Sequence, residues 1–185
     1  MHVDEVLQKC DQTYVIFDTS IILDYIRLSS RDKNHRLEVL SYIINNCRNK
    51  VITLLNLEEI LVGNIGNKEE IENFIFYSFK ILNITEKEAE VTAELEVKVR
   101  EEGLGFKGEN WRIDLFIASF AYTRSYYILT KDSDFKKILD CKLHLLHIIH
   151  YLELHAQGIQ RPTTPNYSKL TNMFCIWKSD YQTDG

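Results

Sequence analysis

Short apolar runs alternate with longer amphipathic segments along most of the chain. The first run, 14–17, is rich in β-branched and aromatic residues and is followed over 21–26 by apolar spacing that suits a short helix. Thr85 and Glu88 have the spacing of a capping box and mark the start of a longer, charged helix. The same pattern predicts strands at 14–17, 51–54, 81–84, 126–130 and 143–146, and helices at 21–26, 35–46, 57–62, 68–79, 85–102, 111–124 and 133–139.

This alternation of strands and helices predicts an α/β domain with a parallel sheet. Right-handed crossovers place helices on both faces of such a sheet, so we expect three layers, α/β/α, around a central parallel sheet of about five strands. Beyond residue 150 the pattern loosens, and both prolines, Pro162 and Pro165, fall in a polar stretch. We therefore expect a folded domain over residues 1–150 and a C-terminal appendage over residues 151–185.

Composition narrows the class of protein. Apolar residues make up 45% and charged residues 26% of the chain, as in ordinary soluble globular domains. The formal net charge of −5 argues against nucleic-acid binding through a diffuse basic surface, because such binding needs many Lys and Arg side chains against phosphates. No apolar run approaches the roughly 18 residues that cross a bilayer, and no signal-peptide pattern opens the chain. We expect a cytoplasmic protein without membrane contact.

The cysteines and a histidine repeat do not predict a zinc site or a disulfide framework. Histidines recur at every third residue near the end of the predicted domain, a spacing that suits neither one face of a helix nor one face of a strand. They are His144, His147 and His150. The cysteines lie far apart without a CxxC pair, so we expect reduced thiols. They are Cys10, Cys47, Cys141 and Cys175.

Four acidic residues are expected at one edge of the predicted sheet. In an open parallel sheet, the loops that leave the carboxyl ends of the strands form the binding crevice. Asp18 and Asp132 lie in such loops, and Glu59 falls in the first turn of the helix that leaves the second strand. Asp114 lies in the first turn of a helix that runs antiparallel to the strand after it, and that helix therefore begins at the same edge.

Asp114 is the most informative of the four acids. Its helix is apolar almost all round, which is typical of a buried helix. A carboxylate there needs a counter-charge, and four converging carboxylates would raise one another's pKa values unless a cation lay between them. Oxygen ligands without His or Cys favour Mg²⁺ or Mn²⁺ over zinc. The sequence therefore predicts a divalent-cation site at this edge.

Each acid also has a purely structural interpretation. Asp18 and Asp132 could cap the helices that follow them, and Glu59 could close a capping box on Asn56. Asp114 could be favoured by the helix dipole alone. Capping explains four acids at one edge poorly, because a cap need not point into the crevice. A haloacid-dehalogenase-like phosphatase would require a second Asp where Ser20 stands.

At these residues the sequence resembles the PIN-domain nucleases and, within them, the VapC-like toxins of toxin–antitoxin pairs. The resemblance covers roughly residues 13–148 and rests on the order and spacing of four segments. They are Val15-Ile16-Phe17-Asp18-Thr19-Ser20, Ile52-Thr53 leading to Glu59-Ile60-Leu61-Val62-Gly63, Ile113-Asp114-Leu115-Phe116-Ile117-Ala118, and Leu129-Thr130-Lys131-Asp132-Ser133-Asp134-Phe135. The resemblance implies a parallel-sheet fold and an acidic cluster that binds Mg²⁺ or Mn²⁺ to cut RNA, leaving a 5′-phosphate.

The resemblance also implies a role for each matching residue. Asp18, Asp114 and Asp132 would be the principal metal ligands, and Glu59 would act directly or through a water molecule. Glu59 is preferred to Glu58 because its spacing to Gly63 resembles the family pattern. Two further sets are implied: Asp134 as an additional ligand, and Thr19, Ser20, Arg112 and Lys131 as candidate substrate contacts.

Two departures bear on the function. Ser20 stands where many relatives have Asn, which affects one hydrogen bond at the site, and the tail after His150 exceeds that of compact VapC-like proteins. The leading hypothesis is therefore a metal-dependent ribonuclease of the VapC type, with RNA as substrate and an antitoxin protein and a second copy of the chain as candidate partners. The alternatives are a PIN nuclease of RNA maturation and a non-catalytic PIN-like module that binds RNA or protein.

Overall fold

The computed structural model describes most of the chain up to residue 138 and two short strands after it. The described residues are 3–29, 35–103, 110–132, 134, 135, 138, 149–150 and 175–178. Their helices are α1 (Val3–Gln12), α2 (Thr19–Ser29), α3 (His35–Asn46), α4 (Leu54–Val62), the 3-10 helix η1 (Ile65–Asn67), α5 (Lys68–Ser78), α6 (Glu86–Glu101) and α7 (Trp111–Arg124). Their strands are β1 (Val15–Phe17), β2 (Lys50–Thr53), β3 (Lys80–Leu82), β4 (Tyr127–Thr130), β5 (Ile149–His150) and β6 (Cys175–Lys178). None of the helices in these ranges is long and apolar enough to cross a membrane.

The sheet has a parallel part and an antiparallel extension. Its order is β3-β2-β1-β4-β6-β5, and the strands from β3 to β4 pair in parallel. β6 pairs antiparallel with both β4 and β5. The predicted α/β class with a parallel sheet is confirmed, with four parallel strands described where about five were expected. The strand predicted at 143–146 lies outside the described residues, whereas β6, from the predicted C-terminal appendage, extends the sheet.

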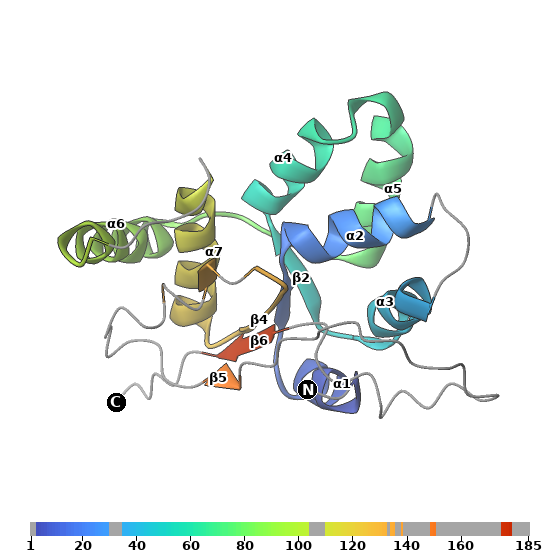
Figure 1. Cartoon of the computed structure of the whole chain (residues 1–185), viewed down its shortest axis with the longest axis horizontal. Helices are drawn as coiled ribbons and strands as arrows, with labels where there is room; N and C mark the ends of the chain where they lie inside the picture. Colours follow the sequence, from blue (N-terminus) through green and yellow to red (C-terminus); the bar gives the residue numbers. More distant parts are fainter. Residues whose placement is uncertain are drawn as a thin grey trace.

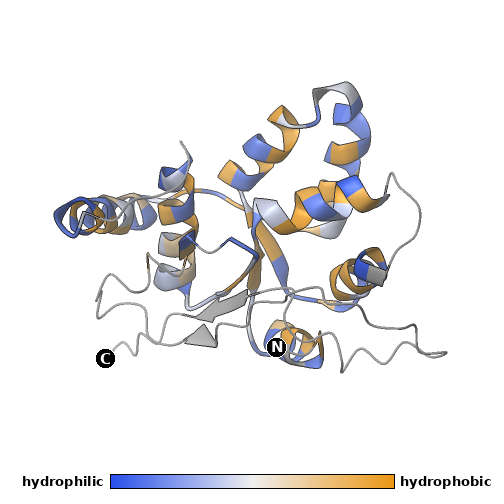
Figure 2. Cartoon of the chain, in the orientation of Figure 1, coloured by the Kyte–Doolittle hydropathy of each residue, from blue (hydrophilic) through white to orange (hydrophobic). Residues whose placement is uncertain are grey.

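Helices cover both faces of the parallel strands, as the three-layer prediction requires. Because side chains alternate along a strand, Phe17 points to one face of the sheet and Ile16 to the other. Phe17 packs with core residues of α1 to α5, and Ile16 packs with those of α6 and α7. Figure 1 shows α6 and α7 on one side of the central strands and α2 to α5 on the other. In Figure 2 apolar and polar positions alternate along these helices, as expected for elements with one buried face.

One edge of the parallel strands collects the segments that carry the predicted acids. Asp18 directly follows β1, and Asp132 follows β4 after one residue. α4 begins immediately after β2, so Glu59 lies in its second turn. α7 leads back to β4 and therefore begins at the edge where β4 ends, which places Asp114 there. The topology therefore places these four residues at the same edge of the sheet, as predicted.

The capping box predicted at the start of the charged helix is confirmed, and its Glu88 also forms an ion pair with Arg124. The Thr85 backbone N–H donates to Glu88 Oε2 at 2.9 Å, and the Thr85 hydroxyl donates to the same oxygen. Glu88 Oε1 accepts from the Thr123 hydroxyl at 2.8 Å and lies 3.0 Å from Arg124 Nε, both on α7. The Arg124, Thr85 and Thr123 hydrogen bonds lower the pKa of Glu88 to about 2, against the opposing effect of burial. This buried carboxylate therefore joins α6 to α7.

Replacing Glu88 with glutamine is expected to lower the free energy of unfolding by about 2–3 kcal/mol at neutral pH, because Arg124 loses its charged partner. The folded-state pKa lies below the unfolded value, so this stabilisation is present above about pH 4.5 and is lost as the pH falls towards about 2. Urea denaturation at pH 7 measures the difference. Glu90→Gln, an exposed change on the same helix, is the control; equal midpoints for the two variants would contradict the assignment.

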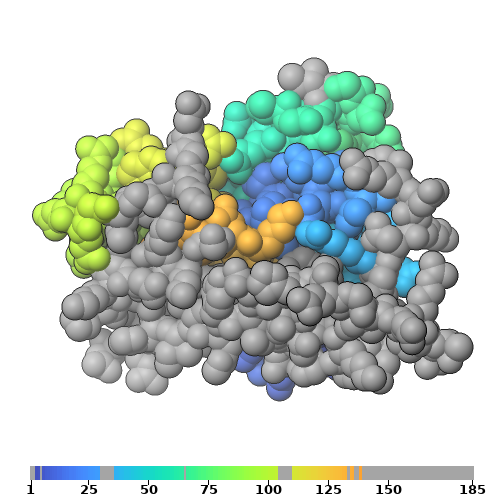
Figure 3. All heavy atoms as spheres, viewed as in Figure 1, coloured from blue at the N-terminus to red at the C-terminus, as the bar shows by residue number. Residues whose placement is uncertain are grey.

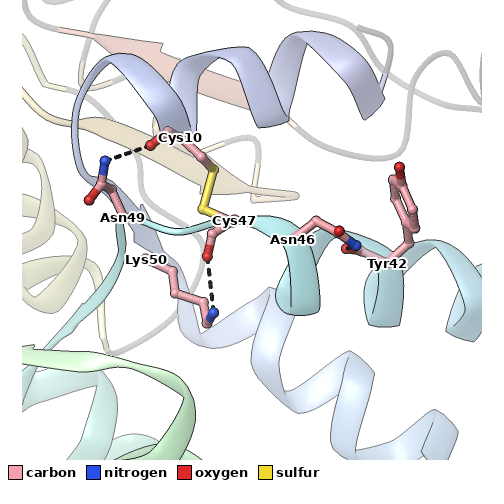
Figure 4. The surroundings of a disulfide bond; sticks show 6 residues. All are labelled: Cys10, Tyr42, Asn46, Cys47, Asn49 and Lys50. Atoms are coloured by element: carbon pink, nitrogen blue, oxygen red, sulfur yellow. Dashed lines mark hydrogen bonds between the residues drawn. A yellow bond between two sulfur atoms is a disulfide. The ribbon is translucent and has the colours of Figure 1, made fainter.

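A disulfide joins two of the four cysteines (Figure 4). Cys10 of α1 and Cys47, just after α3, are bonded with their Cα atoms 5.3 Å apart. The Asn49 side chain donates to the Cys10 carbonyl at 2.8 Å, and Lys50 Nζ donates to the Cys47 carbonyl at 3.0 Å. The expectation of reduced thiols is therefore wrong for this pair. α1 and the end of α3 pack in one core cluster, which brings together residues that lie 37 positions apart.

Candidate active site

Asp18 lies at the centre of the carboxyl edge and is almost fully buried, at 4% exposure. Its Oδ2 accepts hydrogen bonds from the Ser20 hydroxyl at 2.5 Å and from the Thr130 hydroxyl at 2.7 Å. Burial raises the pKa of Asp18, the hydrogen bonds from Ser20 and Thr130 oppose the shift, and the charge of Asp132 adds to it. A buried carboxylate held by neutral hydroxyls still needs a positive partner in its ionised form.

Glu59 is held on both of its carboxylate oxygens. Oε2 accepts from the Thr19 hydroxyl at 2.6 Å, and Oε1 accepts from the Asn110 side-chain amide at 3.0 Å. Asn56 Nδ2 donates to Thr19 Oγ1 at 2.9 Å, which directs the single hydroxyl proton of Thr19 towards Glu59. Burial raises the pKa of Glu59, with contributions from the charges of Asp18 and Glu58.

The capping interpretation of Glu59 is wrong. The cap of α4 is Thr53, whose hydroxyl accepts from the Asn56 backbone N–H at 3.2 Å while the Asn56 side chain accepts from the Thr53 N–H at 2.9 Å. Asn56 is thus the third residue of the helix, and Glu59 lies in the second turn instead of the predicted first. α4 begins at Leu54, three residues before the predicted start, because Thr53 ends β2 and caps the helix at once.

Asp132 and Asp134 come from the turn that follows β4. Asp132 Oδ1 accepts from the Asp134 backbone N–H at 2.8 Å, so Asp132 does cap the turn that follows it. The Asp132 N–H donates to Thr130 Oγ1 at 2.9 Å, and Thr130 in turn donates to Asp18. Asp134 is 4% exposed. Thr130 therefore connects the acids of β1 and β4, and capping does not remove Asp132 from the edge.

Asp114 lies within the electrostatic field of the other acids. Its pKa is raised to about 8, first by burial and then by the negative charges of Asp18, Asp132, Glu59 and Asp134. These residues come from three other segments of the chain. The prediction that the acids lie close together in the fold is therefore confirmed. With this pKa Asp114 is mostly protonated at neutral pH, and a positive charge in the region would favour its ionised form.

Arginine and lysine side chains do not balance these charges. Within the described ranges, Asp18, Glu59, Asp114 and Asp132 form no ion pair with Lys or Arg. Their donor atoms are carboxylate and hydroxyl oxygens, which hard divalent ions prefer. As they stand, no three acidic, histidine or cysteine side chains in the described part of the chain are gathered tightly enough to hold one ion. The oxygen donors are thus of the kind that a divalent cation takes, and the described side chains are not arranged around one ion in this structure.

The predicted substrate contacts lie around this region but are already engaged. Lys131 Nζ lies 2.5 Å from Asp24 Oδ1 of α2. Arg112 Nη2 lies 2.6 Å from Glu96 Oε1 of α6, so its ion pair is with a carboxylate outside the acidic set. Thr19 and Ser20 donate their hydroxyl protons to Glu59 and Asp18, as described above. Contact of any of them with a substrate stays a prediction.

Three polar residues of the site were missed in the sequence. Thr130 is fully buried at the end of β4, and Asn56 is fully buried in the first turn of α4. Asn110 precedes α7 and contacts Glu59 across 51 positions of sequence. Thr130 lies two residues before Asp132, so a polar residue at the end of an apolar strand was the available signal. Nothing in the local pattern pointed to Asn56 or Asn110.

The acids predict an unusual pH dependence in the metal-free protein. The folded-state pKa of Asp114, about 8, lies above the usual aspartate value of 3.8. The folded state therefore binds more protons than the unfolded state between these values, and stability falls as the pH rises from about 4 to about 8. Melting temperatures measured in EDTA over this range should decrease, and Mg²⁺ or Mn²⁺ should reverse the decrease. Asp114→Asn should flatten the slope; an unchanged slope would contradict the assigned pKa.

Comparison with known families agrees with this geometry. A family model described as the PIN domain matches residues 15–139, a segment that contains all five acids. No curated protein sequence gives a match.

Two solved structures are similar to this chain at low sequence identity. A toxin–antitoxin complex from Klebsiella pneumoniae contains a chain 22% identical, with a TM-score of 0.48, covering 64% of this chain and 87% of that one. The VapBC2 complex from Rickettsia felis, bound to a DNA fragment from its promoter, contains a chain 21% identical, with a TM-score of 0.52, covering 68% of this chain and 92% of that one. The second likeness supports the assigned architecture.

Proposed function

Because the chain belongs to the PIN-domain family, as the match over residues 15–139 shows, we propose that it is a metal-dependent endoribonuclease. Asp18, Asp114 and Asp132 would bind Mg²⁺ or Mn²⁺, with Glu59 and Asp134 completing the acidic set. The proposed substrate is RNA, and a cytoplasmic location is part of the proposal. The observation that carries the proposal is the placement of Asp114, which lies half-buried on α7 among the charges of four other acids from three other segments; burial and these charges raise its pKa to about 8.

The residues around the acids support this proposal by holding carboxylates in place. Ser20 and Thr130 donate to Asp18, and Thr19 and Asn110 donate to the two oxygens of Glu59. These neutral donors orient the carboxylates without neutralising them, which leaves their charge available to a cation. A bound Mg²⁺ or Mn²⁺ supplies positive charge that lowers the pKa of an attacking water and stabilises the departing oxygen.

The finer proposal is a VapC-like toxin with an antitoxin partner. The likeness to a chain of the Rickettsia felis VapBC2 complex, which spans 92% of that chain, supports it together with the family match. Expression in a host cell tests this part: growth arrest that a co-expressed small partner relieves supports a toxin, and harmless accumulation supports a nuclease of RNA maturation. A homodimer stays a prediction.

Cleavage of total RNA tests the nuclease itself. The purified chain is expected to cut RNA in the presence of Mg²⁺ or Mn²⁺, and EDTA should abolish the cleavage. The products should carry 5′-phosphate ends, which ligation to an adaptor detects. An absence of cleavage, together with an absence of metal-linked stabilisation, would favour the non-catalytic module instead, because a degenerate site would bind no cation.

A further inference from the structure

Beside the acids, one carboxylate on α2 holds two cations. Asp24 Oδ1 lies 2.5 Å from Lys131 Nζ, and Asp24 Oδ2 pairs with Nη2 of Arg36 at the start of α3. The Asp24 side chain is 13% exposed, whereas those of Lys131 and Arg36 are 35% and 41% exposed. The carboxylate thus lies inward and the two cations outward. We call Lys131 and Arg36 the Asp24 cation pair.

The cation pair adjoins the acidic cluster. Lys131 directly precedes Asp132, and its backbone N–H lies 3.5 Å from Ser20 Oγ, the hydroxyl that donates to Asp18. Asp24 follows Ser20 by one helical turn on α2. In Figure 3 the orange segment after β4 lies on the same face as α2 and the start of α3, coloured in blues. The cation pair is therefore a neighbour of the acidic cluster through Lys131 and Ser20.

The Asp24 cation pair carries more positive charge than the Asp24 carboxylate neutralises. Two cations on one carboxylate leave a net charge of +1, next to a region where five acids repel a phosphodiester. Arg36 Nε is buried and has no hydrogen-bond acceptor in the part of the chain that the structure describes. Guanidinium and ammonium groups are the usual donors to phosphate oxygens. The net positive charge and the exposure of both cationic side chains fit contact with an anion outside the protein, whereas the buried Arg36 Nε itself is not open to it.

We propose that Lys131 and Arg36 bind a backbone phosphate of the RNA strand next to the acidic cluster, and that Asp24 positions both cations. This inference rests on the proposed ribonuclease function. The inference adds Arg36 and Asp24 to the predicted substrate contact at Lys131. Because the Asp24 cation pair would contact phosphate and not a base, it would contribute affinity for RNA without preference for a base.

The test measures RNA binding separately from cleavage. A fluorescein-labelled single-stranded RNA oligonucleotide is titrated with Asp114→Asn protein, which binds without cutting, and anisotropy gives Kd from about 50 to about 200 mM salt. The test variant adds Lys131→Met and Arg36→Met to this background. The control adds Lys9→Met and Lys80→Met, which remove the same charge at the opposite edge, where Lys9 lies over the Tyr127 ring and Lys80 over the Tyr14 ring.

Loss of one to two phosphate contacts should lower the slope of log Kd against log salt by roughly 0.7 to 1.4. Over the fourfold salt range, the Kd of the parent should therefore rise roughly three- to sevenfold more than that of the test variant. The control should keep the parental slope. Lys131→Arg alone should retain it as well, because arginine still reaches phosphate. In the cleaving protein, the double change should raise KM and leave kcat within about twofold.

Two results would overturn the inference: an unchanged slope in the test variant, or an equal loss in the control. Asp24→Asn tests the positioning role. Removal of the carboxylate removes the partner that holds both cations, so the slope of log Kd against log salt should fall towards that of the test variant although the protein has lost a negative charge. Tighter RNA binding with the parental slope would count against the proposal. If the unmodified chain cuts no RNA but the salt slopes behave as described, the nuclease proposal fails and the phosphate site stands.

Discussion

Asp114→Asn is expected to reduce metal-dependent RNA cleavage by about 10³-fold or more while the fold is retained. Asp114 is half-buried on α7 and lies in the field of four other acids. Asparagine keeps the size of the side chain and removes its negative charge. The cation therefore loses a carboxylate ligand and part of the electrostatic attraction that holds it. The measurement is kcat/KM for a single-stranded RNA oligonucleotide in Mg²⁺, with circular dichroism to verify the fold.

The matched control for this prediction is Asp11→Asn, an exposed acid of α1. It removes the same charge at the end of α1, before the amino end of β1 and therefore at the opposite edge of the sheet from the acids, and should leave kcat/KM within about twofold. In EDTA at about pH 8, Asp114→Asn should melt at a higher temperature than the parent, because it relieves repulsion among buried acids. Undiminished cleavage by Asp114→Asn would refute the assignment of Asp114, whatever its stability.

Reduction of the Cys10–Cys47 disulfide is expected to lower the free energy of unfolding by about 4 kcal/mol. The bond closes a loop of 37 residues, and in the chain-entropy model a loop of this length restricts the unfolded state by about that amount. Guanidinium denaturation with and without a reductant measures the change. Such a loss is a large part of the stability of a typical domain.

The double variant Cys10→Ala, Cys47→Ala is the control for the reductant. It should unfold at the lowered midpoint under both conditions, because it has no bond to break. Its RNA cleavage at low temperature should match that of the parent. The disulfide joins α1 to the end of α3, and these segments lead into the amino ends of β1 and β2, opposite the edge that carries the acids. A parental midpoint that does not respond to reductant would mean that the bond contributes no stability.

Local signals predicted some elements closely. α7 has the predicted bounds, because apolar residues predominate from its start to Tyr122 and the helix ends where Ser125 adopts a left-handed backbone with φ 54°. The capping box at Thr85 and Glu88 needs only residues three positions apart. α4 was placed too late, because Thr53 fits the end of a strand and a helix cap equally well. α1 was not predicted, although Val6 and Cys10 face the core, since polar residues separate its few apolar ones.

The common edge of the acids also followed from the sequence, because strand direction and crossover handedness determine where each strand ends. The partners of each acid did not follow. Thr19 meets Glu59 across 40 positions, and Thr130 meets Asp18 across 112. No periodic pattern encodes such contacts. The ion pairs of Lys131 and Arg112, which occupy two predicted substrate contacts, were hidden for the same reason.

Apolar periodicity, capping signals and the order of strands were thus enough to determine the α/β class, the boundaries of several helices and the edge that carries Asp18, Glu59, Asp114 and Asp132. These features depend on neighbours in sequence or on general rules of chain direction. The disulfide, the hydroxyl and amide donors around the acids and the Asp24 cation pair were decided only by tertiary structure. Each depends on side chains that are distant in sequence and meet when the helices pack on the sheet.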